Sequence, residues 1–202
     1  MIAAQHMIGV VLAGGGSTRM GTDKALLEID GTTMIERVTE TLRKVFEEVV
    51  VVSNVPVKYR FLDLPVFPDI MRDCGPLGGI HSALTHLETE AVFVVSCDTP
   101  FVSEGLIRHL LRSRENHELC VPQMGKQVHP LCGIYQKTAL PVITQRLQQR
   151  QLRLREIFNV VDTRIIPIGP ELPFYHSNLL KNFNTPGEFK QYSQRGFPKK
   201  WF

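Results

Sequence analysis

The stretch Ile8-Gly-Val-Val-Leu-Ala-Gly-Gly-Gly16 decides the fold of this chain of 202 residues. Its first part, Ile8 to Leu12, is a short apolar run, which is typical of a buried strand in a parallel sheet. A loop rich in Gly, Ser and Thr follows it directly, from Ala13 to Asp23. In open α/β sheets, ligands bind beyond the carboxyl ends of the strands. We therefore expect a buried strand that ends at a binding loop.

Strands and helices alternate on the C-terminal side of this loop. Four consecutive valines, Val49 to Val52, and the apolar run Ala91 to Ser96 predict two further buried strands. Thr33-Met-Ile-Glu36 has the form of a capping box and predicts a helix start, and Ser103 can cap a later helix. A helix is also expected from Gly79 to Leu87. This alternation through about residue 113 implies right-handed βαβ units around a parallel sheet.

The second half of the chain is patterned less clearly. We expect strands at 119–122 and 131–135, helices at 138–150 and 153–160, an edge strand at 163–168 and a final helix from Thr185 onward. We predict an α/β fold made of a single Rossmann-like domain with three layers, a mostly parallel central sheet and helices on both faces. The expected domain covers residues 8–192, between an N-terminal extension, residues 1–7, and a basic C-terminal tail, residues 193–202.

Composition and charge narrow the functional classes. The formal net charge is +3 and the apolar fraction is 43%, whereas a nucleic-acid-binding protein usually gathers a larger positive excess on one stripe. The four cysteines contain no C-x-x-C pair, which argues against a zinc cluster or a redox dithiol. The sequence shows no signal peptide, and no run approaches the roughly 20 apolar residues that span a bilayer. We therefore expect a cytoplasmic protein with neither nucleic-acid nor membrane partners.

The loop after the first strand has the residues of a phosphate-binding loop. Its glycines allow backbone N–H groups to face an anion, and Arg19 and Lys24 can neutralise a triphosphate. It is not a Walker A loop, because no hydroxyl residue follows Lys24. It is not a dinucleotide-binding fingerprint, because Arg19 stands where that pattern needs glycine. The glycines alone are equally compatible with a tight turn that carries two surface cations.

Polar residues also follow the other predicted strands. Ser53 and Asn54 follow the valine strand, and Asp69 follows the short run 65–68. The turn Gly75–Gly79 leads into a helix N-terminus, which attracts anions. Asp98 follows the strand that ends at Ser96, where a carboxylate can hold Mg²⁺ together with waters and substrate phosphates. Each residue alone is compatible with an ordinary turn, but four polar turns at one sheet edge predict a ligand site.

The segment Leu12-Ala-Gly-Gly-Gly-Ser-Thr-Arg-Met-Gly-Thr-Asp-Lys24 resembles the L-A-G-G-x-x-x-R-M-G-x-D-K signature of the MobA family of molybdenum cofactor guanylyltransferases. The first motif alone is shared by a wide superfamily of nucleotidyltransferases. The resemblance continues at Asp69, Gly75-Pro-Leu-Gly-Gly79, Cys97-Asp-Thr-Pro100, His129-Pro130 and Asn182-Phe-Asn-Thr-Pro186. It covers the chain from Ile8 to about Tyr192, and the combination is much more specific.

This resemblance implies a transfer of GMP from GTP to molybdopterin, with Mg²⁺ as the cofactor. It implies that the nucleotide is bound by Leu12, Ala13, Gly14, Gly15, Lys24, Asn54, Asp69, Gly75, Pro76, Leu77, Gly78 and Asp98. The implied catalytic residues are Arg19, Lys24 and Asp98, and Asp98 is the metal ligand. The acceptor is assigned to Asn182, Asn184 and His129, with His129 expected as a wall of the site rather than a catalyst. Molybdenum-insertion proteins and apo-molybdoenzymes are the implied protein partners.

Three alternatives remain at this stage. A molybdopterin cytidylyltransferase would share the fold, but the family resemblance favours GTP because the chain reads Leu12-Ala-Gly-Gly15. Nucleotidyltransferases for sugar phosphates or alcohol phosphates share the first loop only. A non-catalytic nucleotide-binding adaptor would not need an intact set of Arg19, Lys24 and Asp98. The basic run Arg146, Arg150, Arg153 and Arg155 is interpreted mainly as a solvated helix face, with a docking surface for an anionic cofactor or an acidic partner as the alternative.

Overall fold

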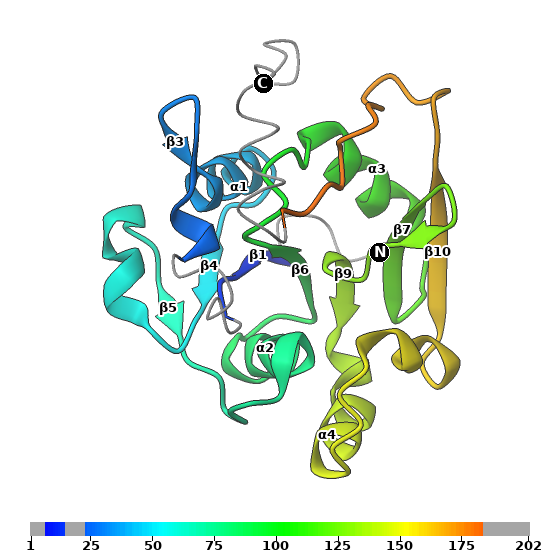
Figure 1. Ribbon diagram of the computed structural model, residues 1–202. Helices are drawn as coiled ribbons and strands as arrows, with labels where there is room; N and C mark the ends of the chain where they lie inside the picture. The colour runs from blue at the N-terminus through cyan, green and yellow to red at the C-terminus, as the bar shows by residue number, and fades with distance from the viewer. Residues whose placement is uncertain (1–6, 15–22, 184–202) are drawn as a thin grey trace.

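The fold is built around one mixed sheet, whose strands run through the middle of the computed structural model (Figure 1). The structure describes residues 7–14 and 23–183. Within them, the strand order is β10-β7-β9-β6-β1-β4-β5, and β8 pairs with β7. The strands of this sheet are β1 (Met7–Leu12), β4 (Val49–Val52), β5 (Val66–Phe67), β6 (Ala91–Ser96), β7 (Leu119–Met124), β8 (Gln127–Val128), β9 (Cys132–Gln136) and β10 (Thr163–Ile168).

Helices cover both faces of this sheet. The α-helices are α1 (Met34–Arg43), α2 (Gly75–His86), α3 (Glu104–Ser113) and α4 (Leu140–Gln148). Short 3-10 helices are η3 (Lys24–Leu26), η4 (Pro56–Leu62), η5 (Lys137–Ala139) and η6 (Leu154–Asn159). Helices α1 and α3 lie on one face, and α2 and α4 lie on the other (Figure 1). The three-layer α/β architecture predicted from the sequence is therefore confirmed.

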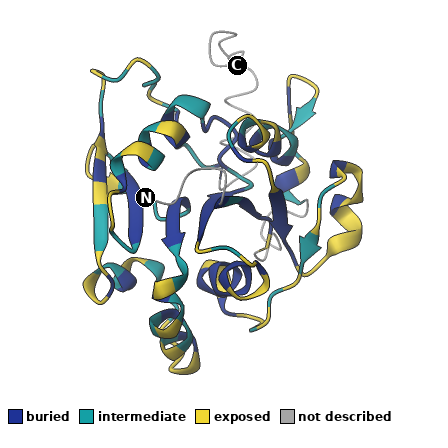
Figure 2. Ribbon diagram, turned by 180° about the vertical axis from the view of Figure 1, so that it is seen from behind, coloured by how far each residue is buried: buried dark blue, intermediate teal, exposed yellow. Residues whose placement is uncertain are grey.

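The sheet separates two hydrophobic cores. Val11 packs into the core under α1 and α3, whereas Val10 and Leu12 face α2 and α4. Strands buried on both faces need apolar side chains at every position, which explains the uninterrupted runs in β1, β4 and β6. All residues of β4 and β6 are buried, while the outer faces of the helices are exposed (Figure 2).

The parallel half of the sheet gathers the loops that matter for function. Strand β1 pairs in parallel with β4 and β6, with Gly9 opposite Val49 and Phe93, and β4 pairs in parallel with β5. The carboxyl ends of these four strands therefore meet at one edge. Strand β9 is antiparallel to both of its neighbours, β6 and β7. The sheet is thus mostly parallel, with β9 dividing its two parallel groups.

The helix-start signals read from the sequence are confirmed. Thr33 caps α1 in a capping box, with the Glu36 backbone N–H donating to Thr33 Oγ1 and the Glu36 carboxylate accepting from the Thr33 backbone N–H. The Leu106 backbone N–H donates to Ser103 Oγ at the start of α3. The expected edge strand 163–168 is β10, at the end of the sheet.

Several expected boundaries are wrong. Helix α2 begins at Gly75 rather than Gly79, because Gly75 takes a positive φ of 59° and the proline that follows it suits a first helical turn. The expected helix 138–150 is split into η5 and α4, with Pro141 in the first turn of α4. The expected helix 153–160 is the 3-10 helix η6. The sequence patterns also missed η4, β8 and the hairpin of β2 (Glu28–Ile29) and β3 (Thr32–Thr33).

Two further findings concern the state of the cysteines and the helices' ability to cross a membrane. The four cysteines are all present as thiols. Across residues 7–14 and 23–183, none of the helices combines the length and the apolar character that crossing a membrane requires. The expected final helix from Thr185 and the tail beyond it lie outside the described residues.

Candidate functional site

The end of β1 lies at the centre of the candidate site. The Ala13 backbone N–H donates to the carbonyl of Val52 at 2.9 Å, and the Cys97 N–H donates to the carbonyl of Leu12 at 3.1 Å. These bonds extend the parallel pairing beyond the strands, so the turns after β1, β4 and β6 lie side by side. Leu12 and Ala13 are buried and Gly14 is exposed. The backbone after Leu12 thus opens onto the surface at this edge.

Asn54 and Asp69 form a reciprocal pair beyond the ends of β4 and β5. The Asn54 side-chain amide donates to Asp69 Oδ2 at 2.8 Å, and the Asp69 backbone N–H donates to Asn54 Oδ1 at 3.0 Å. Burial raises the pKa of the Asp69 carboxyl, and the hydrogen bond from Asn54 opposes that shift. The sequence alone placed both residues at strand ends, but it gave no sign that they bind each other.

The first turn of α2 packs closely against these residues. A Cβ on Gly79 would lie 3.0 Å from Leu12 Cδ2 and 3.7 Å from Asp69 Oδ1. A Cβ on Gly78 would lie 2.9 Å from the Cβ of Cys74. Ser82 Oγ accepts from the Ile70 N–H at 2.8 Å, which ties the loop after β5 to the same helix. Glycine is therefore needed here for close approach, and the N-terminus of a 12-residue helix is brought to the site.

Asp98 lies at the end of β6 beside several other charges. Ser96 Oγ donates to Asp98 Oδ1 at 2.6 Å, which orients the carboxylate. Burial, then the charges of Asp98 and Asp23, raise the pKa of the Cys97 thiol, and the charge of Lys24 opposes them. The thiol stays protonated, so it is not a nucleophile at neutral pH.

The donor set at Asp98 fits a hard cation that is held mainly by its substrate. Within the described residues, no group of three or more His, Cys, Asp or Glu side chains is arranged to hold a metal ion. Mg²⁺ is commonly bound through one or two carboxylates while substrate phosphates and waters supply the other ligands. A single oriented carboxylate, Asp98, matches that requirement.

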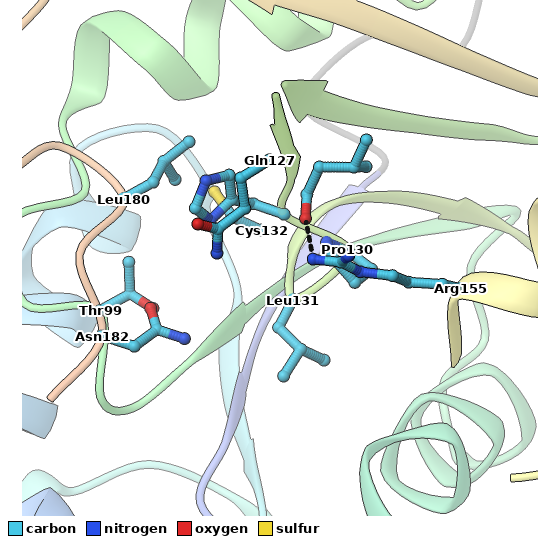
Figure 3. A pocket seen from close by; sticks show the side chains of 10 residues that line it. Thr99, Gln127, Pro130, Leu131, Cys132, Arg155, Leu180 and Asn182 are labelled. Carbon is cyan, nitrogen blue, oxygen red and sulfur yellow. Dashed lines mark hydrogen bonds between the residues drawn. The ribbon is translucent and has the colours of Figure 1, made fainter. Parts of the chain in front are cut away.

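A hollow begins at Thr99, the residue that follows Asp98 in the sequence (Figure 3). It is a pocket of about 150 Å³ lined by Thr99, Gln127, Val128, His129, Pro130, Leu131, Cys132, Arg155, Leu180 and Asn182. Thr99 Oγ1 donates to Asn182 Oδ1 at 2.9 Å, and the two side chains lie together on one side of the pocket. Arg155 enters from the opposite side, where its guanidinium donates to the Val128 carbonyl at 3.1 Å.

The structure brings together two of the three residues assigned to the acceptor. His129 and Asn182 both line the pocket, although they are 53 positions apart in the sequence. The pocket also contains Thr99, which the sequence did not single out for this role, and Arg155, for which a docking surface for an anionic cofactor was the alternative interpretation. No sequence pattern links these segments, because only the fold brings 99, 127–132, 155 and 180–182 together. Asn184, Gly15 and Arg19 lie outside the described residues.

The basic run is not one uniform helix face. Arg146 and Arg153 form ion pairs with Glu156, at 2.7 and 3.5 Å. Arg150 contacts Cys74 Sγ at 3.8 Å. Only Arg155 of this run lines the pocket described above. Arg150, Arg153 and Arg155 are exposed, as the solvated-face interpretation predicts, whereas the side chain of Arg146 is mostly buried.

His129 is held in an environment that favours its neutral form. Its Nε2 is buried and has no hydrogen-bond partner in the part of the chain that the structure describes. Burial, then the charge of Arg155, lower the pKa of the His129 imidazole. The unfolded chain therefore binds this proton more readily. The resulting stability is present above the unfolded pKa of about 6.5 and is lost as the pH falls through the folded pKa.

Replacing Arg155 by glutamine should raise the pKa of His129 toward 6.5, because one nearby positive charge disappears. An NMR titration of the imidazole signals would measure this shift directly. Arg153→Gln is the matched control, since the side chain of Arg153 is 87% exposed, and it should leave the pKa of His129 unchanged. An identical His129 titration in the wild type and in Arg155→Gln would contradict this account of the pocket.

Comparison with known proteins identifies the family. A model of the MobA-like NTP transferase domain matches residues 9–163. The molybdenum cofactor guanylyltransferase of Desulfosudis oleivorans is 34% identical over 191 residues, covering 91% of this chain and 92% of that protein. The protein named probable molybdenum cofactor guanylyltransferase in Clostridium perfringens strain 13 is 34% identical over 184 residues, covering 89% and 92%.

The fold is also shared with a solved structure. The crystal structure of molybdopterin-guanine dinucleotide biosynthesis protein A from Archaeoglobus fulgidus superposes with a TM-score of 0.79 at 23% identity. The superposition covers 94% of this chain and 98% of that one. The chain belongs to the family of MobA-like NTP transferases.

Proposed function

We propose that the chain transfers GMP from GTP to the terminal phosphate of molybdopterin, forming the guanine dinucleotide cofactor and releasing pyrophosphate. The observation that carries this proposal is the position of Asp98 and Thr99. Asp98 follows β6 at the carboxyl ends of the parallel strands, where the nucleotide is proposed to bind, and the next residue, Thr99, lines the pocket. A carboxylate between two proposed substrate sites suits a transfer between two bound molecules. The names of the relatives support GTP and molybdopterin as the pair.

The nucleotide is assigned to the parallel side of the edge. Its base and ribose would contact Leu12, the Asn54–Asp69 pair and the first turn of α2, which packs on Leu12. The residues assigned to the nucleotide are Leu12, Ala13, Gly14, Gly15, Lys24, Asn54, Asp69, Gly75, Pro76, Leu77, Gly78 and Asp98. Lys24 and Arg19 would contact the phosphates. Their cationic side chains neutralise charge that grows as pyrophosphate leaves.

The acceptor is assigned to the pocket that begins at Thr99. Asn182, held by Thr99, and His129 would bind polar atoms of the molybdopterin, together with Asn184. Arg155 adds a positive charge to the same pocket, which suits an acceptor that carries a phosphate. The pocket of about 150 Å³ adjoins a further hollow that shares Gln127, His129, Leu180 and Asn182 with it. Together the two hollows offer space for a molecule larger than either one holds.

The reaction needs positioning more than acid–base catalysis. The acceptor phosphate is already largely ionised at neutral pH, since its second pKa is about 6. It can therefore attack the α-phosphorus of GTP directly, and the bond to the pyrophosphate oxygen breaks. No general base is required, which agrees with a neutral His129 and a protonated Cys97. The side chains hold the two phosphates in line and neutralise their charges.

We also propose Mg²⁺ as the cofactor, held on the protein side by Asp98. When bound, it would stabilise negative charge on the phosphate oxygens. The reaction is proposed to take place in the cytoplasm. Molybdenum-insertion proteins and apo-molybdoenzymes are the proposed partners that deliver the acceptor and receive the product.

Calorimetry with each of the four NTPs in the presence of Mg²⁺ tests this function first. We expect GTP to bind at least tenfold more tightly than the other three, a difference of about 1.4 kcal/mol. Pyrophosphate release on addition of molybdopterin would then establish the transfer. A preference for CTP would move the activity to a cytidylyl transfer. Nucleotide binding without any pyrophosphate release would favour a nucleotide-binding adaptor over an enzyme.

A further inference from the structure

Tyr59 contacts the residues at the two ends of the segment between β1 and η3, Ala13 and Asp23. It belongs to η4, is 2% exposed, and its Oη lies 3.1 Å from Asp23 Oδ2 and 3.4 Å from the carbonyl oxygen of Ala13. Ala13 directly follows β1, and Asp23 directly precedes η3. One buried hydroxyl therefore lies between the backbone at the end of β1 and the start of the next helix. Burial, then the charge of Asp23, raise the pKa of the Tyr59 phenol, which keeps its proton available to donate.

Asp23 has bonding partners on both of its carboxylate oxygens. Oδ1 accepts from the Ala25 backbone N–H at 3.2 Å and so caps η3. Oδ2 accepts from Tyr59 and forms an ion pair with Lys58 Nζ at 3.2 Å. Its side chain is only 17% exposed. The orientation of η3 is thus fixed to η4 through a single carboxylate.

Lys24 is the first residue of η3, immediately after Asp23. Tyr59 Oη joins Asp23 to the Ala13 carbonyl, and the carbonyl of the preceding residue, Leu12, accepts from the Cys97 N–H. The start of η3 and the turn that carries Asp98 therefore both lie at the end of β1. Whatever orients Asp23 also determines where the stem of Lys24 begins.

We propose that Tyr59 and Lys58 are positioning residues, which hold Asp23 so that η3 presents Lys24 toward the triphosphate beside Asp98. This inference rests on the proposed function, in which Lys24 and Asp98 act on the phosphates of a nucleoside triphosphate. A lysine side chain has a flexible stem, and ordering it before the substrate arrives reduces the cost of placing its charge. A shift of about 1 Å in a positioned group can lower a rate by about a hundredfold.

The test compares Tyr59→Phe, Asp23→Asn and the double variant. Tyr59→Phe removes one hydroxyl and should lower kcat by about tenfold, with a smaller change in KM for GTP because the contacts to base and ribose remain. In the Asp23→Asn background the same replacement should have little further effect, since the tyrosine acts through that carboxylate. A purely structural role for Tyr59 would instead give independent losses that multiply. A kcat within twofold of the wild type for Tyr59→Phe would overturn the inference.

A second pair covers the case in which Tyr59→Phe does not fold. Lys58→Met removes the ion pair to Asp23 and should lower kcat by about threefold, a smaller loss because Lys58 is half-exposed. Lys137→Met is the matched control. Lys137 Nζ donates to the Leu87 carbonyl at 3.1 Å, shortly before the start of β6. This is the other end of the strand from Asp98, so turnover should not change. Equal turnover in these two variants would also overturn the inference.

Hydrogen exchange separates this inference from the proposed function. The Ala25 amide, capped by Asp23, should exchange faster in Tyr59→Phe than in the wild type, whether or not the protein is active on molybdopterin. The Leu106 amide, capped by Ser103, serves as the internal reference and should be unaffected. A wild type that releases no pyrophosphate would contradict the proposed function. Unchanged exchange at Ala25 in Tyr59→Phe would show that Tyr59 does not hold Asp23 in place.

Discussion

Replacing Asp98 by alanine should lower kcat by on the order of a hundredfold or more at saturating GTP and Mg²⁺. Its carboxylate is oriented by Ser96, and the next residue, Thr99, lines the proposed acceptor pocket. Its loss removes the proposed protein ligand for Mg²⁺. Pyrophosphate release in a coupled assay measures the change, and thermal unfolding of the variant shows whether the fold is intact.

Two further variants sharpen this experiment. Asp98→Asn keeps the shape of the side chain and its bond to Ser96 but removes the charge, so it should lose nearly as much activity as Asp98→Ala. Asp162→Ala is the matched control, because Asp162 is an exposed carboxylate paired with His117 at 2.9 Å, away from the site. Near-normal turnover of Asp98→Ala would show that the metal assignment is wrong.

Replacing Phe93 by alanine should destabilise the fold by about 3–5 kcal/mol, the usual cost of emptying a buried aromatic site. Phe93 is fully buried in β6, with its ring centroid 5.5 Å from that of Phe46. Neighbouring helices and strands fix the cavity walls, so little of the lost contact is recovered. Because β6 leads into the turn that carries Asp98, a damaged core on this strand should reduce activity as well.

Urea unfolding at equilibrium measures this loss of stability. Phe61→Ala is the control, since Phe61 lies on η4 with 51% of its surface exposed, and its loss should change the free energy of unfolding by no more than about 0.5 kcal/mol. Equal midpoints for the two variants would mean that Phe93 does not contribute to the core as its burial implies.

The sequence predicted those parts of the fold that depend on neighbours along the chain. β1, β4 and β6 were recognisable because strands covered on both faces need uninterrupted apolar residues. Thr33 and Ser103 were recognisable because a cap bonds an N–H only a few positions ahead. The start of α2 was missed because it depends on the positive φ of Gly75, which no periodicity reports.

The candidate site divides in the same way. Leu12, Asp69 and Asp98 could be placed at one sheet edge because the carboxyl ends of parallel strands must meet there. The hydrogen bonds between Asn54 and Asp69 could not be predicted, since they depend on how two separate loops fold over each other. The contacts of Tyr59 with Asp23 and Ala13 could not be predicted for the same reason, since these residues are distant in sequence and Tyr59 carries no motif.

The antiparallel strand β9 lies between β6 and β7 and so separates the two halves of the candidate site. The glycine loop and the α2 turn are attached to β1, β4, β5 and β6, whereas most of the proposed acceptor pocket is attached to the β7–β8 hairpin and to the segments 155 and 180–182. Under these proposed assignments, remodelling the hairpin should alter the choice of acceptor without disturbing the parallel strands assigned to the nucleotide.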